Sequence, residues 1–341
     1  MNFYVQVNIT THLCRVMPPK NHQNSLFYLY HYCLHLSKIV RAINSPIEEP
    51  IMTVLSTSDL ADYYSLRVDL HSHTKCSDGT LTPQELVERA VNFQLNVLAI
   101  TDHDTVKGLS IAKDYILEKN HPLTLVSGIE ISTSWHGFEI HIVGLNIDVN
   151  NIELQTLISR QQAARELRAT IMGEKLTKCG FPGIYQQAKD LAGEGSITRA
   201  HFAKILLQEG HVDHMQKAFD KYIGKGQRAF VKPTWCSIEE AIAAIHHAGG
   251  NAVIAHPVRY DLSTKWLRRL VVQFKDAKGD GLEIVLPQMA NEQRKLMLSF
   301  CLEYDLHASM GSDFHYPTRW SDLGRNLRMP DTVKPIWDLW H

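Results

Sequence analysis

The stretch Leu66-Arg67-Val68-Asp69-Leu70-His71-Ser72-His73 decides the fold, because it combines the pattern of a strand with two metal-binding side chains. Apolar and polar residues alternate over its first half, as in a half-buried β-strand. Side chains two positions apart share a face, so His71 and His73 should project together from the C-terminal end of this strand. Asp78 follows within the same loop, which gives the spacing of a metal site. On its own the pair could equally be a surface pair or two hydrogen-bonded core histidines.

The same arrangement, a short apolar run followed by a ligand-type residue, recurs along the chain. His103 comes after Leu98-Ala99-Ile100, Glu130 after Leu125-Val126, and His256 after Ala252-Val253-Ile254-Ala255. His141 lies in an alternating segment, and Asp313 and His315 follow Ala308-Ser309-Met310-Gly311. Such clusters of His, Asp and Glu indicate a metal or catalytic site. The predicted ligands are His71, His73, Asp78, His103, Glu130, His141, His256, Asp313 and His315, although Glu130 and His141 taken singly could be satisfied core groups.

The periodicity from Leu66 onward predicts the fold class. Short apolar strands alternate with amphipathic helices, and one helix should start with Thr82 as N-cap and Pro83 in its first turn. A second should begin with a capping box at Ser237. Repeated strand-helix-strand units form parallel α/β barrels, with the site at the C-terminal ends of the strands. We therefore expect all predicted ligands at one mouth of a barrel.

The alternation stops between residues 151 and 232, where we predict an inserted helical subdomain. It should contain helices over Ile152 to Cys179, Ala200 to Leu207 and Met215 to Tyr222. The barrel would then comprise residues 66–150 and 233–341. Residues 1–65 are interpreted as a poorly ordered N-terminal extension, with residues 1–51 alternatively preceding a true start at Met52.

Positive charge is concentrated in the predicted insertion. Most of these side chains should form a solvated helix face, including Arg160, Arg165, Arg168, Lys175, Lys221 and Lys232. Arg199, Lys225 and Arg228 lie near glycines or loop-like segments and are candidates for contacting a substrate phosphate. Arg259 follows His256 by three residues in a predicted loop, where its guanidinium could clamp a phosphate.

Composition favours a cytoplasmic enzyme. The chain has 341 residues, a net charge of −1 and 44% hydrophobic residues, so it offers no basic excess for coating nucleic acid. Its six cysteines form no CxxC pair, which argues against a disulfide framework or a zinc-thiolate site. Charged and polar residues interrupt the membrane candidate over residues 25–43, so no membrane association is expected.

The motifs resemble those of the polymerase and histidinol phosphatase (PHP) superfamily, in the order HSHTKCSDG, TDHDT, GIE, EIHIVG, AHP and GSDFH. Within it, ITDHDT, GIEIST, TRAHFA and AHPVRY look like the branch of nucleoside 3′,5′-bisphosphate phosphatases and 5′-to-3′ exoribonucleases of the RNase AM type. The resemblance implies a distorted (β/α)7 barrel and a centre of three divalent metal ions. Manganese is favoured and iron or zinc is compatible with the same ligand types.

The resemblance also assigns ligands to ions. His71, His73, Glu130 and Asp313 would hold one metal, His141 and His256 a second bridged by Glu130, and Asp78, His103 and His315 the third. A metal-bound hydroxide flanked by His103, Asp313 and His256 would attack the phosphate. Arg199 and Arg259 would recognise a substrate phosphate, whereas Lys225 and Arg228 rest on charge and glycine context alone.

Two groups of neighbouring residues have less certain roles. Asp69, Asp102 and Asp104 could fix imidazole tautomers, although Asp104 could equally be solvent-exposed or cap a helix. Trp135 and Trp235 could stack a base, but core positions are the more frequent fate of such residues.

We thus expect a phosphoesterase that removes the 3′-phosphate of nucleoside 3′,5′-bisphosphates or shortens RNA from its 5′ end, with short single-stranded RNA as partner and no obligate protein partner. Two alternatives stay open. One is a small-molecule phosphatase of the histidinol-phosphate type, which would not need the basic insertion. The other is a metal-stabilised module that binds RNA ends without cutting them.

Overall fold

The computed structural model describes residues 66–341 apart from positions 194, 320 and 341. The predicted extension over residues 1–65, including Met52, lies outside the described residues.

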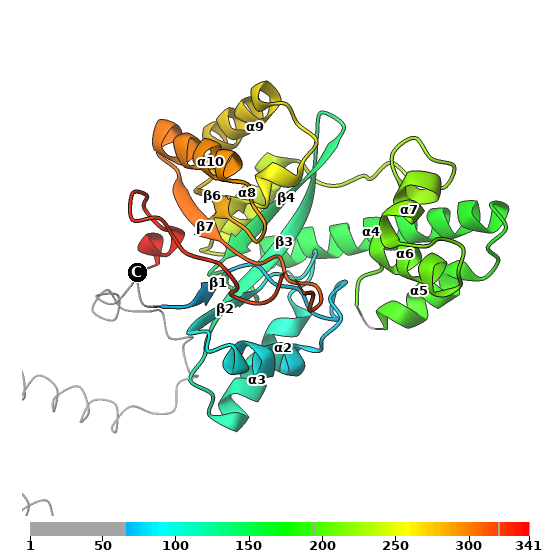
Figure 1. Ribbon diagram of the computed structural model, residues 1–341, viewed down its shortest axis with the longest axis horizontal. Coiled ribbons are helices and arrows are strands. Elements are labelled where there is room, and N and C mark those ends of the chain that lie inside the picture. The colour runs from blue at the N-terminus through cyan, green and yellow to red at the C-terminus, as the bar shows by residue number, and fades with distance from the viewer. Residues whose placement is uncertain (1–65, 194, 320, 341) are drawn as a thin grey trace, which may run out of the picture. The chain divides into compact units, whose positions relative to one another are not determined.

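The centre of the fold is one seven-stranded sheet with the strand order β1-β2-β3-β4-β5-β6-β7 (Figure 1). The strands are β1 (Val68–Asp69), β2 (Val97–Ile100), β3 (Thr124–Trp135), β4 (Phe138–Leu145), β5 (Asn251–Ile254), β6 (Gly281–Val285) and β7 (His307–Met310). The Leu70 amide donates to the Met310 carbonyl at 3.1 Å, which brings the first strand to the last and nearly closes the barrel. The predicted α/β barrel is confirmed.

The barrel departs from the predicted all-parallel arrangement at β4. This strand pairs antiparallel with both β3 and β5, whereas the other neighbouring pairs are parallel. A two-residue hairpin, His136-Gly137, replaces the crossover helix between β3 and β4. Both residues have positive φ, 46° and 82°, as the tight primed turns of hairpins require. Because β4 runs the other way, its start lies at the barrel mouth where the parallel strands end.

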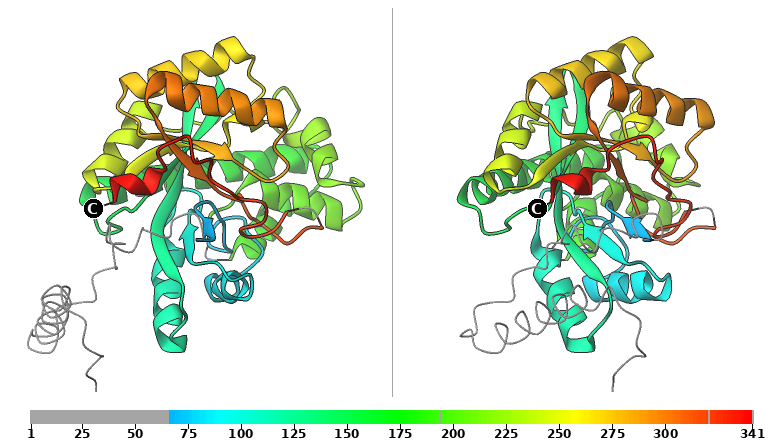
Figure 2. Two further views of the ribbon diagram at one scale, coloured as in Figure 1. Left: turned by 60° about the vertical axis from the view of Figure 1, so that its left-hand side comes forward. Right: turned by 90° about the vertical axis from the view of Figure 1, so that its left-hand side faces the viewer.

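Helices cover the strands between which they run. They are α2 (Pro83–Asn92), α3 (Lys107–Lys119), α8 (Ile238–His247), α9 (Thr264–Asp276) and α10 (Asn291–Tyr304), with short helices η4 (Pro257–Arg259) and η5 (Ile336–Leu339). The predicted capping box at Ser237 and the N-cap at Thr82 are confirmed. Figure 2 shows α9 and α10, in gold and orange, side by side. The apolar faces of the helices pack on the strands and form the barrel core.

A separate group of helices follows β4. It consists of α4 (Ile152–Lys178), α5 (Ile184–Ala192), α6 (Arg199–Gln208), α7 (Met215–Ala218) and η3 (Phe219–Ile223). The predicted helices over 152–179, 200–207 and 215–222 are confirmed, and α5 was not predicted. The second half of α4 packs with α5 to η3 around its own apolar cluster, which includes Met172, Leu176 and Phe202.

The N-terminal part of α4 packs on the barrel through Leu154, Leu157 and Ile158 and, further along, through polar side chains. Gln161, Arg165 and Arg168 are 1%, 7% and 8% exposed, so the expectation of a solvated face is wrong for both arginines. They lie three to four residues apart and therefore on one face of the helix. In the part of the chain that the structure describes, no helix has the length and apolar character needed to cross a membrane.

Candidate metal centre

Two loops are joined by backbone hydrogen bonds at the seam of the barrel. The Asp313 amide donates to the His71 carbonyl at 2.9 Å, and the His73 amide donates to the Phe314 carbonyl at 2.8 Å. The Thr80 amide donates to the His315 carbonyl at 2.8 Å. The loops after β1 and β7 therefore lie side by side, which places the HSH and DFH motifs at one mouth.

Gly311 allows these loops to approach. A Cβ atom on this residue would lie 2.2 Å from Cβ of His71 and 2.8 Å from its amide nitrogen. Contacts below 3.0 Å are not tolerated between real side chains, so only glycine fits without a shift of the backbone.

Glu130 lies at the centre of one group of side chains. It is fully buried within β3, and its carboxylate contacts imidazoles from several strands. Its Oε1 lies 2.9 Å from both His141 Nδ1 and His256 Nε2, and its Oε2 lies 3.4 Å from His71 Nε2. Asp313 Oδ1 also lies 3.4 Å from His71 Nε2. His71, Glu130, His256 and Asp313 thus surround one point between the strand ends.

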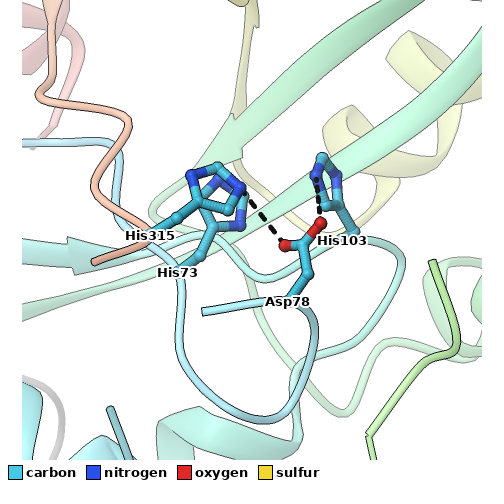
Figure 3. A group of neighbouring side chains, drawn as sticks. All are labelled: His73, Asp78, His103 and His315. Carbon is cyan, nitrogen blue, oxygen red and sulfur yellow. Dashed lines mark ion pairs between the residues drawn. The ribbon is translucent and has the colours of Figure 1, made fainter. Parts of the chain in front are cut away.

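Figure 3 shows the second group, His73, Asp78, His103 and His315. Asp78 is bracketed by two imidazoles, with Oδ1 3.2 Å from His315 Nε2 and Oδ2 3.8 Å from His103 Nε2. The rings of His73 and His315 are stacked with centroids 4.1 Å apart. A third group, His103, Glu130 and His141, joins the first two, because His103 Nδ1 lies 3.0 Å from Glu130 Oε2.

All nine predicted ligands therefore converge at one mouth, and their allocation to individual ions stays a prediction. His73 groups with Asp78, His103 and His315, and His256 groups with His71, Glu130 and Asp313. His73 nevertheless remains within 3.3 Å of Glu130 and 3.2 Å of Asp313. It lies between the two groups, which is why the sequence alone could not allocate it.

The carboxylates of the cluster are ionised in spite of their burial. Burial alone would raise the pKa of Glu130, but His103, His141 and His71 hold its pKa well below the usual range. His103 and His315 likewise overcome burial and lower the pKa of Asp78. Burial lowers the pKa of His73 to about 3, helped by the neighbouring His315 and His103. The carboxylates and the His73 imidazole are thus in the forms that bind metal ions, whereas neighbouring carboxylates raise the pKa of His103 and His315 against the effect of burial.

These donors fit divalent metal ions by chemistry and by spacing. Asp78 Oδ1, Glu130 Oε2 and Asp313 Oδ1 are buried without a hydrogen-bond partner, as are His73 Nδ1, His103 Nδ1 and His256 Nδ1. Buried polar atoms are normally satisfied, so this concentration needs an explanation. Two ligands at about 2.1 Å from one ion and at a right angle to each other would lie about 3 Å apart. The observed separations of 2.9 to 3.4 Å match that spacing.

The predicted phosphate-binding side chains lie at different distances from this cluster. Arg259 pairs with Asp313 and is about half exposed, so it sits at the rim of the cluster. Arg199, on α6, pairs with Glu139 Oε2 at 3.0 Å. Glu139 lies on β4, two residues before His141. Lys225 contacts the hairpin tip, 3.4 Å from the Gly137 carbonyl. Arg228 is exposed and shares no hydrogen bond or ion pair with the predicted ligands that the structure describes.

The prediction that three neighbouring aspartates orient imidazoles is wrong. Asp69 accepts hydrogen bonds from the backbone amides of Ser312 and Gly324. Asp102 accepts from Thr74 and Ser77, and so holds the loop after β1. Asp104 is buried and pairs with Arg165 at 2.6 Å, which excludes a solvent-exposed position as well.

Both tryptophans are core residues and are not available to stack a base. Trp135 is 3% exposed and donates to Gln273 Oε1 at 2.8 Å. Trp235 is 7% exposed, donates to Glu139 Oε1 at 2.9 Å and packs under the guanidinium groups of Arg165 and Arg168.

Two polar residues next to the cluster were missed from the sequence. Glu139 is a hub for Arg168, Arg199 and Trp235, and these arginines hold its pKa below the usual range against the effect of burial. Glu283 lies in β6 and contacts His71 Nδ1 at 2.8 Å. The available signal was an acidic residue inside a short apolar strand, where burial of a charge is costly.

The strands, the seam and the cluster define a metal-binding α/β barrel. A PHP-domain family model matches residues 69–232. The chain belongs to the PHP-domain family.

Relatives cover most of the described region. The 5′-3′ exoribonuclease Rnm of Salmonella typhimurium is 45% identical over 277 residues, which are 81% of this chain and 94% of the relative. The 3′,5′-nucleoside bisphosphate phosphatase of Chromobacterium violaceum is 36% identical over 272 residues, 79% of this chain and 95% of that protein. A solved structure from Bifidobacterium adolescentis, described as a metal-dependent phosphoesterase, is 30% identical to this chain with a TM-score of 0.70. The match covers 81% of this chain and 97% of that one.

Proposed function

We propose that the protein is a metal-dependent phosphoesterase that acts on nucleotide and RNA ends. It removes the 3′-phosphate of nucleoside 3′,5′-bisphosphates and degrades short RNA in the 5′-to-3′ direction. The observation that carries the proposal is the convergence of nine ligand-type side chains, three of whose carboxylate oxygens are buried without a hydrogen-bond partner. The exoribonuclease and phosphatase relatives support the reaction class. We also propose a cytoplasmic location, which suits such substrates.

The proposed centre holds three divalent ions, with manganese favoured over iron or zinc. Each of the three side-chain groups would hold one ion, and Glu130 and His103 each belong to two groups. Bound ions of this kind neutralise phosphate charge and lower the pKa of water to about 7. His103, Asp313 and His256 line the mouth from three different loops, so in this proposal they would surround the attacked phosphorus.

Arginines on two sides of the mouth would bind the substrate phosphate that is not cleaved. Arg259 lies against Asp313 from the barrel, and Arg199 reaches Glu139 from α6. A planar guanidinium can bind two phosphate oxygens at once. We propose that residues 151–232 act as a lid that carries Arg199, with Lys225 and Arg228 attracting longer RNA from the outer edge. One phosphate held by arginines and the next placed at the metals would explain activity on both bisphosphate and RNA.

The test is a parallel assay of three substrates with manganese. Adenosine 3′,5′-bisphosphate, a short 5′-phosphorylated RNA and histidinol phosphate are incubated with the protein, and free phosphate and mononucleotide are measured. Arg259→Ala should raise KM for the first two by about 10- to 100-fold, the value of a charged hydrogen-bonded contact. Arg269→Ala is the matched control, because this exposed arginine stacks on Trp266 of α9 instead.

Two results would contradict the proposal. Release from histidinol phosphate alone would assign the site to a small-molecule phosphatase. No release from any substrate, combined with tight RNA binding, would favour a binding module without catalysis.

A further inference from the structure

Glu283 is a buried carboxylate that lies behind the metal-binding cluster. It is 0% exposed in the middle of β6. One carboxylate oxygen, Oε1, lies 2.8 Å from Nδ1 of His71, and the other, Oε2, accepts from the backbone amide of His256 at 2.5 Å. One side chain therefore contacts two predicted ligands that come from different strand ends, those of β1 and β5.

The surroundings of Glu283 do not supply a permanent positive charge. Among the ion pairs of the described residues, its partner is His71, and neither Lys nor Arg contacts it. A buried carboxylate is retained only when its charge is compensated. A divalent ion held on the far side of His71 would supply that charge, because Nε2 lies there 3.4 Å from an oxygen of Glu130 and of Asp313.

We propose that Glu283 is the positioning residue of the metal centre, which aims His71 and His256 at the same ion. The inference deepens the proposed function and rests on it. It assigns to Glu283 no contact with substrate or with the ion.

The contact with His71 fixes the tautomer of the ring. An imidazole that donates its Nδ1–H to a carboxylate has its free lone pair on Nε2. In this structure Nε2 is the atom that faces Glu130 and Asp313. A carboxylate behind a ligating histidine also increases the basicity of the ring and prevents its rotation.

The contact with His256 fixes a backbone that is unfavourable for a residue with a side chain. His256 has φ 28° and ψ 54°, close to the left-handed region that favours glycine. Residues keep such a conformation when surrounding contacts enforce it. The amide held by Glu283 is one such contact, and in this conformation His256 Nε2 reaches Glu130 Oε1 at 2.9 Å.

Asp280, the residue immediately before β6, provides a matched control. Its Oδ2 lies 2.7 Å from His246 Nε2 and accepts from the Ala252 amide at 2.7 Å. It therefore makes the same two kinds of contact as Glu283, one with an imidazole and one with a backbone amide. Neither His246 nor Ala252 belongs to the metal-binding cluster.

The experiment compares wild type, Glu283→Gln, Glu283→Ala and Asp280→Asn as full-length proteins. Manganese per chain is measured by mass spectrometry after dialysis, and manganese affinity by competition with a chromophoric chelator. Melting temperatures are recorded with and without manganese. Glu283→Gln retains one acceptor oxygen but turns an NH₂ group toward the second donor, so it should lose about 10- to 100-fold in manganese affinity. Glu283→Ala should lose at least as much.

The control separates positioning from general stability. Asp280→Asn should bind manganese as wild type does, whatever its effect on the metal-free melting temperature. Wild-type manganese affinity in both Glu283 variants would overturn the inference, as would an equal loss in Asp280→Asn. A wild-type protein that binds no divalent metal would overturn the proposed function together with this inference.

Discussion

Replacement of Arg165 by methionine tests how the helical segment is anchored to the barrel. Arg165 Nε and Nη2 lie 2.7 and 2.6 Å from Asp104 Oδ2, and Nη2 donates to Ser132 Oγ at 2.7 Å. The two charged side chains are 8% and 0% exposed. Methionine fills a similar volume but leaves the carboxylate of Asp104 buried without a cation.

The expected cost follows from what Asp104 keeps. Its Oδ1 still accepts from the Ser132 amide at 3.0 Å and from Gln161 at 3.2 Å, so the carboxylate is partly satisfied. Removal of one partner from a buried pair costs about 3 to 5 kcal/mol, because the other charge stays uncompensated. We expect Arg165→Met to lose about that much, and the double variant with Asp104→Asn to recover part of it.

The matched control is an ion pair of similar length that another arginine of α4 makes with α8. Arg160 Nη2 lies 2.8 Å from Glu240 Oε1, but the side chains are 56% and 49% exposed. Water screens this pair, so Arg160→Met should cost less than about 1 kcal/mol. Urea unfolding at pH 7 gives both values from the shift in midpoint at a shared slope. Equal small losses in the two variants would refute the reasoning that burial decides the difference.

Two further predictions concern the seam and the surface. Gly311→Ala adds a methyl group 2.2 Å from Cβ of His71, so it should lower the free energy of unfolding by about 1 to 3 kcal/mol. Both the melting temperature and the manganese content should fall, which calorimetry and metal analysis would measure. Unchanged manganese content would contradict this prediction. The hydrogen bond to Asp280 raises the pKa of His246, so the protonated ring stabilises the fold below about pH 6.5 and this contribution is lost as the pH rises through the raised value. His246→Gln should therefore destabilise the protein more at pH 5.5 than at pH 8.5 in urea titrations, and an equal loss at both would count against the pairing.

The sequence predicted the parts of the fold that depend on local patterns. The N-cap at Thr82 and the capping box at Ser237 are short-range signals, and both formed as expected. The strand predicted over Leu66–Leu70 is limited to Val68–Asp69, and both of these residues are buried. The reversal of β4 was not predicted, because alternating residues on either side of His136-Gly137 suit either direction of pairing. The signal in the sequence was the glycine-containing pair His136-Gly137 between two alternating runs, which suits a two-residue hairpin turn. In the structure both residues have positive φ.

The convergence of the nine ligand-type side chains was predicted from the sequence, but their supporting contacts were not. Ligand-type side chains at strand ends converge because parallel strands bring their C-terminal ends to one mouth. The partners of those ligands depend on distances between strands that are remote in sequence. Glu283 and His71 are 212 positions apart, and Arg165 reaches Asp104 across 61 positions. No local pattern encodes such pairs, so Asp104 and Arg165 were wrongly assigned to surface or ligand-orienting roles.

The most direct test of the central claim is phosphate release from adenosine 3′,5′-bisphosphate as a function of manganese bound per chain. The protein is first stripped with a chelator, and manganese is returned in steps while bound metal and rate are measured together. We predict no activity in the stripped protein and a rate that rises with occupancy until the three groups of ligands are filled. Full activity in the stripped protein would contradict the assignment of this cluster as the catalytic centre.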